Sequence, residues 1–540
     1  MHNEILRNQT MANIFSREYL IGQLSQTKAW DVIVIGGGAT GLGVALDSAT
    51  RGYKTLLLEQ VDFAKGTSSR STKLVHGGVR YLAQGDIDLV KEALYERGLL
   101  AQNAPHLVKN QNFIIPNYRW WEGIYYTIGL KAYDFLAGKL SLGKSKHINK
   151  TKTAERLSTL RQKGLYGGVV YKDGQFDDSR LAANIAQTAI ENGATLLNHF
   201  KVTDLIQNET GKIIGVEAKD TETDTQYSFA GDVVINATGV FTDEILRMEN
   251  AEAKKSVVPS QGVHLVFDKS FLPGDDAIMI PKTSDGRVLF AVPWHDKVLV
   301  GTTDTLLDDH SLEPQAQEQE IEFILQTFNN YLNKQVTRAD VRSIFAGLRP
   351  LAAPKDDSEK TKEISRSHKV IVSETGLITI TGGKWTTYRR MAQDTINKAI
   401  SLKKLPKKAC ATEHLAIHGA TPTEDRSNHM YIYGSDQKGI ADLIKAQPEL
   451  GARLHERLPF LKAEVIWAVR YEMARTVEDV LARRVRALFL DAAAARDMTA
   501  EVAAMIAEEL GRDEAWKLNQ IEEFTKLAND YCIENSAVTA

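Results

Sequence analysis

The sequence predicts an α/β protein with a buried parallel sheet near the N-terminus, an antiparallel sheet in the middle and a helical C-terminal unit. Three observations support this prediction. Residues 31–59 read as strand, glycine-rich turn, helix and strand. Residues 256–345 read as short alternating strands separated by turns. Residues 402–540 are rich in Ala, Glu and Arg, which favour helix.

Composition places the chain among ordinary folded proteins. Its 540 residues suffice for roughly two to four domains, and they are 43% hydrophobic and 25% charged. The net charge of −3 gives no reason to expect nucleic acid as a partner. Two cysteines, Cys410 and Cys532, make no disulfide framework or metal site, so we expect a reducing compartment. The first residues lack the apolar core of a signal peptide, and no run approaches the roughly 20 apolar residues of a spanning helix.

The first predicted strand covers residues 31–35, an aspartate followed by β-branched residues only. Residues 40–51 then show helical periodicity, and Gly52 ends this helix. Residues 55–58 form a second strand, which Glu59 closes. This order predicts a βαβ arrangement of parallel strands.

The turn after the first strand has the spacing G-x-G-x-x-G, formed by Gly36, Gly38 and Gly41. Gly36 permits the tight turn, Gly38 leaves room for a pyrophosphate at the backbone, and Gly41 lets the helix pack close to the strand. The helix N-terminus offers free N–H groups to phosphates, and Glu59 can accept hydrogen bonds from a ribose. This context predicts a dinucleotide site, although the motif does not choose between FAD and NAD.

A second polar segment, residues 66–81 with the sequence GTSSRSTKLVHGGVRY, favours FAD. A permanently bound cofactor needs contacts along its whole length, and these hydroxyl groups and glycines suit a pyrophosphate and a flavin edge. Arg80 could hold an anionic substrate. The alternative is a polar surface loop, because segments rich in Ser, Thr and Gly are common in loops.

Residues 119–142 are crowded with aromatic side chains and are followed by lysines. Aromatic rings at headgroup depth beside lysines are typical of a helix that lies in a membrane interface. On sequence alone, an aromatic core helix under a cap domain explains the segment equally well.

Two later segments are expected to return to the cofactor. The strand at 232–236 runs into Ala237-Thr238-Gly239 and would cover the dinucleotide from the other side. The strand at 377–381 ends in Gly382-Gly383-Lys384 before another helix. A helix N-terminus and a lysine would there face an anion, which could be reduced flavin.

The C-terminal part, residues 402–540, begins with a basic, proline-containing linker and then becomes largely helical. Thr476 to Asp479 resembles a capping box at the start of a helix. Because this part carries no constellation of catalytic groups in its sequence, we expect it to have a structural or interaction role.

Several segments resemble, in the same order, those of FAD-dependent glycerol-3-phosphate dehydrogenases. They are IGGGATGLGVALDSATRG (35–52), KLVHGGVRYL (73–82), SQGVHLVF (260–267), VGTTD (300–304), AGLRPL (346–351), GGKWTTYRRMA (382–392) and RTVEDVLARR (475–484). The resemblance is strong over residues 31–400 and extends into the helical C-terminal part.

The resemblance implies an α/β fold with a Rossmann-like FAD-binding domain of the D-amino-acid-oxidase or glutathione-reductase type, an antiparallel substrate-cap sheet and an all-α C-terminal domain. It implies oxidation of sn-glycerol 3-phosphate to dihydroxyacetone phosphate, with electrons passing through FAD to a membrane quinone. It further implies peripheral attachment to the cytoplasmic side of the inner or cell membrane. The C-terminal helices could support a homodimer.

The expected organisation has three parts: an N-terminal extension (1–27), an FAD-dependent oxidoreductase domain (28–401) and the C-terminal helical domain (402–540). Within the oxidoreductase domain we expect FAD-binding segments at about 28–110, 170–245 and 345–400, and substrate-cap segments at about 111–169 and 246–344.

The resemblance also assigns the site residues. A phosphate dianion needs the planar fork of arginine, so the expected substrate-binding residues are Arg80, Tyr81, His264, Arg349 and Arg366. The expected catalytic residues are His264, Arg349 and Lys384. The expected cofactor-binding residues are Gly36, Gly38, Ala39, Thr40, Gly41, Glu59, Thr67, Ser68, Ser71, Lys73, Gly77, Gly78, Gly239, Gly382, Gly383, Lys384 and Thr386.

His264 is the candidate general base, because imidazole titrates near working pH and can take the alcohol proton. The alternative is that His264 only hydrogen-bonds the substrate oxygen. Lys384 would stabilise the negative charge that builds on the flavin.

Other functions on the same fold remain open at this point. A glycerol-3-phosphate oxidase differs only in its acceptor, and the lack of a long insertion in the middle of the chain favours a dehydrogenase. A flavin amine oxidase acting on glycine-like substrates would need a single carboxylate-binding arginine. A non-enzymatic FAD-binding or membrane scaffold protein would hold flavin that no small substrate reduces. An NAD-dependent dehydrogenase is disfavoured, because it has no flavin for the glycine-lysine segment around Lys384 to contact.

Overall fold

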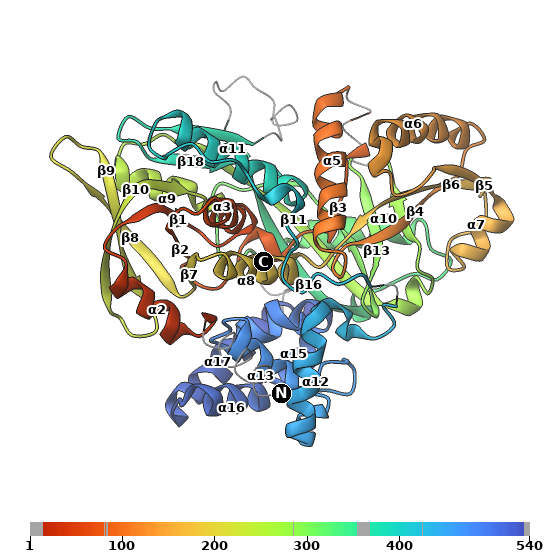
Figure 1. Cartoon of the computed structure of the whole chain (residues 1–540). Helices are drawn as coiled ribbons and strands as arrows, with labels where there is room; N and C mark the ends of the chain where they lie inside the picture. The colour runs from red at the N-terminus through yellow and green to blue at the C-terminus, as the bar shows by residue number, and fades with distance from the viewer. Residues whose placement is uncertain are drawn as a thin grey trace.

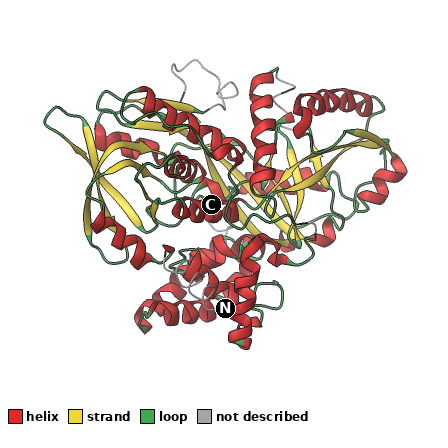
Figure 2. Cartoon of the chain, in the orientation of Figure 1, coloured by secondary structure: helices red, strands yellow, loops and turns green. Residues whose placement is uncertain are grey.

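The structure, a computed structural model, describes residues 14–79, 82, 85–283, 286–353, 368–423 and 425–533. Two sheets lie side by side, and a helical C-terminal unit, blue in Figure 1, lies below them. Figure 2 shows the strands of both sheets in yellow, with helices covering them. This is the predicted fold class: a cofactor-binding α/β part, an antiparallel sheet and a C-terminal helical unit.

The first sheet has the strand order β17-β18-β10-β1-β2-β7, and its central strands are parallel. Strand β9 pairs with β10 in antiparallel fashion, and β8 pairs with β9. The bounds are β1 Trp30–Ile35, β2 Thr55–Leu58, β7 Thr195–Leu197, β8 Phe200–Gln207, β9 Ile213–Asp220, β10 Gln226–Asn236, β17 Lys369–Val372 and β18 Ile378–Thr381.

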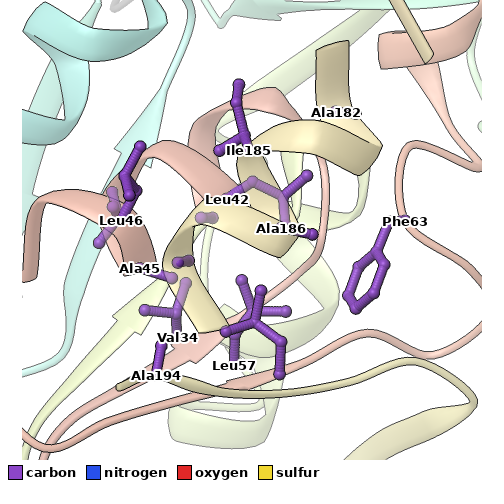
Figure 3. Packing of buried hydrophobic residues seen from close by; sticks show 14 of the residues in the cluster. Val34, Leu42, Ala45, Leu46, Leu57, Phe63, Ala182, Ile185, Ala186 and Ala194 are labelled. Atoms are coloured by element: carbon purple, nitrogen blue, oxygen red, sulfur yellow. The ribbon is translucent and has the colours of Figure 1, made fainter. Parts of the chain in front are cut away.

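Helix α3 (Ala39–Thr50) follows β1 directly and packs on this sheet. Its apolar residues Leu42 and Leu46 lie near Val34 of β1 and Ile185 of helix α8 (Asp178–Glu191), as Figure 3 shows. All four of these side chains are buried, which removes their apolar surface from water and fixes α3 against the strand. The N-terminus of α3 is thereby held at the carboxyl ends of the parallel strands, where ligands bind in open α/β sheets.

The second sheet is mainly antiparallel, with the order β15-β11-β14-β13-β12-β4-β6-β3; β16 pairs with β11, and β5 with β6. A long strand pair near one end of this sheet, β11 and β16, carries His264 opposite Phe345. The bounds are β3 Leu74–Val75, β4 Lys109–Asn117, β5 Lys146–Asn149, β6 Gly167–Gln175, β11 Val257–Asp268, β12 Ala277–Ile280, β13 Leu289–Trp294, β14 Lys297–Gly301, β15 Thr305–Leu306 and β16 Val341–Ala352.

Further helices surround the two sheets. They are α2 Arg17–Gln26, α5 Ile87–Asn103, α6 Glu122–Ala137, α7 Lys150–Arg156, α9 Thr242–Glu249, α10 Glu318–Asn329 and α11 Tyr388–Ser401. Helix α2 lies within the predicted N-terminal extension, and Arg17 joins it to the β8–β9 hairpin by an ion pair with Asp220 at 2.7 Å.

The C-terminal unit is helical, as predicted, and shares an apolar core with the second sheet through Val266, Trp294 and Phe345. The predicted capping box is confirmed, because Thr476 N donates to Asp479 Oδ2 at 3.0 Å and Asp479 N donates to Thr476 Oγ1 at 3.1 Å. The helix that follows is a π-helix, which the sequence did not predict. The bounds are α12 Gln437–Ala446, α13 Lys462–Tyr471, π-helix Asp479–Arg484, α14 Ala487–Leu490, α15 Ala492–Asp497, α16 Thr499–Leu510 and α17 Glu514–Asp530.

Candidate active site

Two adjoining cavities, of about 200 and 330 Å³, run from the parallel sheet to the antiparallel one. The first opens at the carboxyl ends of β1, β2 and β10, and the second lies beside β11 and β16. Both are lined by Thr67, Pro350 and the turn 382–385, so they form one elongated space. Length and continuity of this kind suit a dinucleotide that presents one end to a substrate.

The first cavity is built around the predicted glycine turn. Gly36, Gly38, Ala39 and Thr40 line it, and Gly36 has a φ of +104°, which favours glycine. A Cβ on Gly41 would lie 1.9 Å from the Gly36 carbonyl oxygen, so Gly41 allows the close packing of α3 without lining the cavity itself. The N-terminal N–H groups of α3 therefore face the space where phosphates are expected.

Glu59 also lines the first cavity, at the end of β2. Its Oε2 accepts from Gly37 N at 2.6 Å, and its Oε1 accepts from Val61 N at 3.0 Å. Burial raises the pKa of this carboxyl, while the two backbone N–H groups oppose that shift. These bonds fix the carboxylate, and each oxygen keeps a second lone pair for a ribose hydroxyl.

Two predicted hydroxyl residues link the first cavity to its neighbours. Ser68 Oγ accepts from Ala39 N at 2.9 Å, and Thr67 Oγ1 donates to the carbonyl of Leu348. Trp385 Nε1 donates to the carbonyl of Ser68 at 2.8 Å. The segment beginning at residue 66 is therefore a structured wall between the two cavities, and the alternative of a simple surface loop is wrong.

The remaining glycines predicted for the cofactor mostly reach the cavities. Gly239 lines the first cavity, Gly78 lines the second, and Gly382 and Gly383 line both. All four have positive φ, between 62° and 78°, where side chains are disfavoured. Beside them, Lys384 lines both cavities, and Thr386 and Ser71 line the second.

The second cavity has one polar side and one apolar wall. The polar side carries Arg70, Ser71, Thr72, His264, Thr302 and Arg349, and the apolar wall carries Val79, Phe113, Tyr171, Met279, Val288 and Phe290. A small anionic substrate would therefore bind at the polar side, next to the turn that carries Lys384.

Arg349 of β16 is positioned by the turn 302–304, which joins β14 to β15. Its Nη2 donates to Thr302 Oγ1 at 3.1 Å and to the carbonyl of Thr303 at 3.2 Å, and its Nη1 lies 3.5 Å from Asp304 Oδ1. A Cβ on Gly262 of β11 would lie 2.3 Å from Nη2, so only glycine leaves room for the guanidinium there. The fork is thus held at the cavity by its neighbours.

His264 of β11 is buried at the same side of the cavity. Its Nε2 lies 3.0 Å from Thr72 Oγ1. Burial, together with the positive charges of Lys73 and Arg349, lowers the pKa of His264 well below its ordinary value. The imidazole is therefore neutral at working pH and able to accept a proton.

The structure does not bring Lys73 or Gly77 to the cavities. Lys73 Nζ is fully buried and donates to Asp178 Oδ2 and to the carbonyl of Ser69, both at 2.7 Å. Burial lowers its pKa to about 8. Gly77 N donates to the hydroxyl of Tyr133 at 2.8 Å. Both residues therefore stabilise the polar segment on the side that faces away from the cavities. Their direction is set by their partners Asp178 and Tyr133.

The C-terminal unit reaches the same segment. Arg486 Nη2 donates to the carbonyl of Ser69 at 2.8 Å and to Asp178 Oδ1 at 3.1 Å. Nearby, Arg483 and Arg484 both pair with Asp62, at 2.5 and 2.8 Å. All of these side chains are buried, so the unit predicted to be structural anchors the loop that lines both cavities.

Three predicted substrate residues, Arg80, Tyr81 and Arg366, lie outside the described residues. The structure adds lining residues that the sequence did not single out, among them Arg70, Thr72, Gly262, Thr302 and Trp385. Arg70 and Thr72 stand in the polar segment, so their residue types were a usable signal. Gly262 and Thr302 lie in the resembling segments SQGVHLVF and VGTTD, but the sequence assigned them no role, because that role depends on how distant segments meet.

The geometry fits FAD. A glycine turn and a helix N-terminus at one end suit a pyrophosphate, and Lys384 and neutral His264 both line the cavity at the other end. There is no space for a Cβ at Gly36 or Gly41. Such a closely packed glycine turn is what a tightly bound dinucleotide requires. Fold and site together define an FAD-dependent oxidoreductase.

Comparisons with known proteins give the family. The profile described as FAD dependent oxidoreductase matches residues 31–389, and the profile described as C-terminal domain of alpha-glycerophosphate oxidase matches residues 373–517. The chain belongs to the family of FAD-dependent glycerol-3-phosphate dehydrogenases.

The relatives cover almost the whole chain. A probable mitochondrial glycerol-3-phosphate dehydrogenase of Caenorhabditis elegans is 41% identical over 97% of this chain and 77% of its own length. The mitochondrial enzyme of Homo sapiens is 40% identical over 94% of this chain and 74% of its own length. The solved structure of the glycerol-3-phosphate dehydrogenase from Bacillus halodurans complexed with FAD is 30% identical and covers 98% of this chain and 100% of its own, with a TM-score of 0.79.

Proposed function

We propose that this protein oxidises sn-glycerol 3-phosphate at C2 to dihydroxyacetone phosphate and passes the electrons through FAD to a membrane quinone. The observation that supports it best is that Arg349 and neutral His264 line the same cavity, which adjoins the expected flavin position. A guanidinium fork suits the phosphate, and a neutral imidazole suits the secondary alcohol. The family to which the chain belongs supports the same substrate.

In this mechanism Arg349 binds the phosphate and thereby places C2 of the substrate near the turn 382–385. Arg70 lines the same cavity, but its guanidinium is paired with Glu313 at 2.7 Å, so Arg349 is the candidate for the phosphate. Bound FAD supplies the acceptor for the hydride from C2. His264 takes the alcohol proton, and Lys384 lies where it lowers the cost of negative charge at the cofactor.

Helix α6 supports the proposed attachment to a membrane. One face packs inward through Leu130 and Tyr133, whereas the other face is exposed, with Phe135 85% and Ile128 66% accessible. The exposed apolar residues are Trp120, Trp121, Ile124, Tyr125, Ile128 and Phe135. A core helix would bury such residues, while an interfacial helix presents them to lipid.

The helices of the described ranges all fall short of the length and apolar character that a membrane crossing requires. Attachment through one face of α6, with the lysines that follow it near anionic lipid, is therefore the form we propose. The proposed location is peripheral, on the cytoplasmic side of the membrane.

Anaerobic mixing with glycerol 3-phosphate tests the activity. Purified protein in mild detergent should lose the visible absorbance of oxidised flavin on mixing, whereas glycerol and glycine, which lack the phosphate, should leave it unchanged. Recovery of the absorbance on adding a soluble quinone, and only slow recovery in air, is expected. Bound flavin that glycerol 3-phosphate does not bleach would contradict the substrate.

The reoxidation step separates the two acceptors. Fast recovery of the flavin absorbance in air would contradict the quinone and identify a peroxide-forming oxidase on the same fold. The profile of the C-terminal part carries the description of an oxidase, which makes this the second candidate.

Flotation with anionic vesicles tests the attachment. Ile128→Glu combined with Phe135→Glu should abolish co-flotation, because two charges would enter the apolar face. Leu518→Glu is the matched control, since Leu518 is also exposed (58%) but lies on α17. Equal flotation of both proteins would contradict attachment through α6.

A further inference from the structure

We propose that Thr72 is a catalytic residue of this enzyme: its hydroxyl relays the alcohol proton of the substrate to Nε2 of His264. The inference rests on the proposed oxidation of glycerol 3-phosphate and deepens it, because it names the group that contacts the reacting hydroxyl.

The imidazole of His264 is fixed in place. It stacks on Phe345, with ring centroids 5.0 Å apart and an interplanar angle of 18°. Next to the ring, a Cβ on Gly301 would lie 2.3 Å from Cδ2, so the backbone of β14 is in close contact. A ring held between an aromatic face and a backbone cannot swing toward a substrate without disturbing two strands.

Only one nitrogen of His264 is available to the cavity. Nδ1 is buried and has no hydrogen-bond partner among the described residues. Nε2 lies 3.0 Å from Thr72 Oγ1, and Thr72 itself lines the second cavity. Thr72 Oγ1 is thus the hydrogen-bond partner of Nε2, and the relay places it between the substrate hydroxyl and that nitrogen.

Thr72 is held at this position by its two chain neighbours. Ser71 Oγ donates to Asp178 Oδ2 at 2.7 Å, and Lys73 Nζ donates to the same oxygen at 2.7 Å. The backbone of Thr72 is thus tied on both sides to one buried carboxylate, which Arg486 also contacts. A hydroxyl on such an anchored backbone can rotate its proton while its oxygen stays in place.

The substrate O–H gives its proton to Thr72 Oγ1 while Thr72 gives its own hydroxyl proton to His264 Nε2, so Thr72 ends as a neutral hydroxyl. Bound FAD would accept the hydride from C2, and the C2–O bond would become the carbonyl of the ketone. Phosphate bound at Arg349 offsets one of the two positive charges, Lys73 and Arg349, that disfavour a charged imidazole. Substrate binding thereby prepares His264 to hold the proton.

The test compares Thr72→Val, which removes the hydroxyl and keeps the shape, with Thr72→Ser, which keeps the hydroxyl. The readouts are FAD content and the limiting rate of anaerobic flavin reduction in H2O and in D2O. We expect Thr72→Val to retain FAD and to slow reduction by about 10²-fold or more, and Thr72→Ser to stay within about tenfold of the parent. The solvent isotope effect on reduction should change in Thr72→Val and persist in Thr72→Ser.

A double variant shows whether the two residues act on one path. Thr72→Val combined with His264→Asn should be no slower than the slower single variant, within about threefold, because both remove the same proton transfer.

Three results would overturn the relay. Reduction of Thr72→Val within about threefold of the parent would show direct contact of substrate with imidazole. Equal slowing in Thr72→Ser and Thr72→Val would assign the effect to shape. Multiplying effects in the double variant would separate Thr72 from His264. Failure of the parent protein itself to bleach with glycerol 3-phosphate would contradict the proposed function instead, so the two failures are distinct.

Discussion

The two ends of the elongated cavity are built in different ways. At the dinucleotide end, the turn 36–41 presents backbone N–H groups, and glycines remove side chains from the space. At the substrate end, side chains from three separate segments of the chain converge: Arg349 from β16, His264 from β11 and Thr72 from the polar segment. The dinucleotide end is therefore shaped by the backbone and by the lack of side chains, whereas the substrate end is shaped by the positions of particular side chains.

This difference predicts how substitutions should impair each end of the cavity. A backbone cradle fails when any atom is added to it, and it then loses its ligand altogether. A side-chain site fails by degrees, since each group contributes its own part to binding or to the transition state. Variants at the two ends should therefore separate retention of FAD from use of substrate.

The largest effect is expected for Gly41→Ala. The new Cβ would lie 1.9 Å from the Gly36 carbonyl oxygen, so α3 must move away from β1 and the phosphate site is lost. We expect protein that purifies without flavin, measured by its visible absorbance. The control is Gly129→Ala in α6, where no atom lies within 4 Å and alanine favours the helix. Full flavin content in Gly41→Ala would break the comparison.

Arg349→Ala should have the next largest effect and a different one. Truncating a half-buried partner of the phosphate should lower kcat/KM for glycerol 3-phosphate by about 10³-fold, with FAD retained. Steady-state kinetics beside flavin absorbance check this. The matched control is Arg338→Ala, which removes an arginine paired with Glu318 and Glu322 away from both cavities. Loss of flavin together with activity would show that Arg349 belongs to the cofactor end.

Lys384→Met tests the border between the two ends. The side chain lines both cavities, so its loss should slow flavin reduction by about 10²-fold, with bound FAD and unchanged affinity for the substrate. Rapid mixing over a range of glycerol 3-phosphate concentrations separates rate from affinity. A weaker apparent affinity at an unchanged limiting rate would contradict a role in charge stabilisation.

The smallest effect concerns pH. His264 stays neutral in the folded protein, whereas the unfolded chain takes up a proton as pH falls below about 6.5, so acid destabilises the fold through this residue. His418, held between Glu191 and Asp436, has its pKa raised to about 10 and does the opposite: its stabilisation is complete below 6.5 and is lost as pH rises toward 10.

Urea unfolding at several pH values measures these two contributions. His264→Asn should flatten the loss of stability between pH 6.5 and 5, by at most about 1.4 kcal/mol per pH unit. His418→Asn should lose more stability at pH 6 than at pH 10. The same pH dependence in both variants would contradict the opposite environments of the two histidines.

The dinucleotide end could be predicted from the sequence because it is local. Residues 36–41 form one turn, and the spacing of their glycines encodes the conformation directly. The same locality explains the correct prediction of the capping box at Thr476. Local spacing did not reveal the π-helix that follows, since its residues are ordinary helix formers.

The substrate end could be predicted only in part. Residue type and family resemblance pointed to Arg349 and His264, yet their partners Gly262 and Thr72 depend on strand pairing and on contacts between distant segments. Lys73 shows the same limit of sequence analysis, because here a residue type suggested a contact that the fold does not make. Its place among hydroxyl residues suggested the cofactor, but its direction is set by the buried carboxylate of Asp178.

The pairing of Arg483 and Arg484 with Asp62 has a consequence for biosynthesis. A ribosome delivers Asp62 early and its two arginines only near the end of translation. Until they emerge, closing the loop would bury an unpaired carboxylate, at a cost of several kcal/mol. We therefore expect chains that stop before Arg483 to hold less flavin than the full chain, which the visible absorbance of the purified protein would measure.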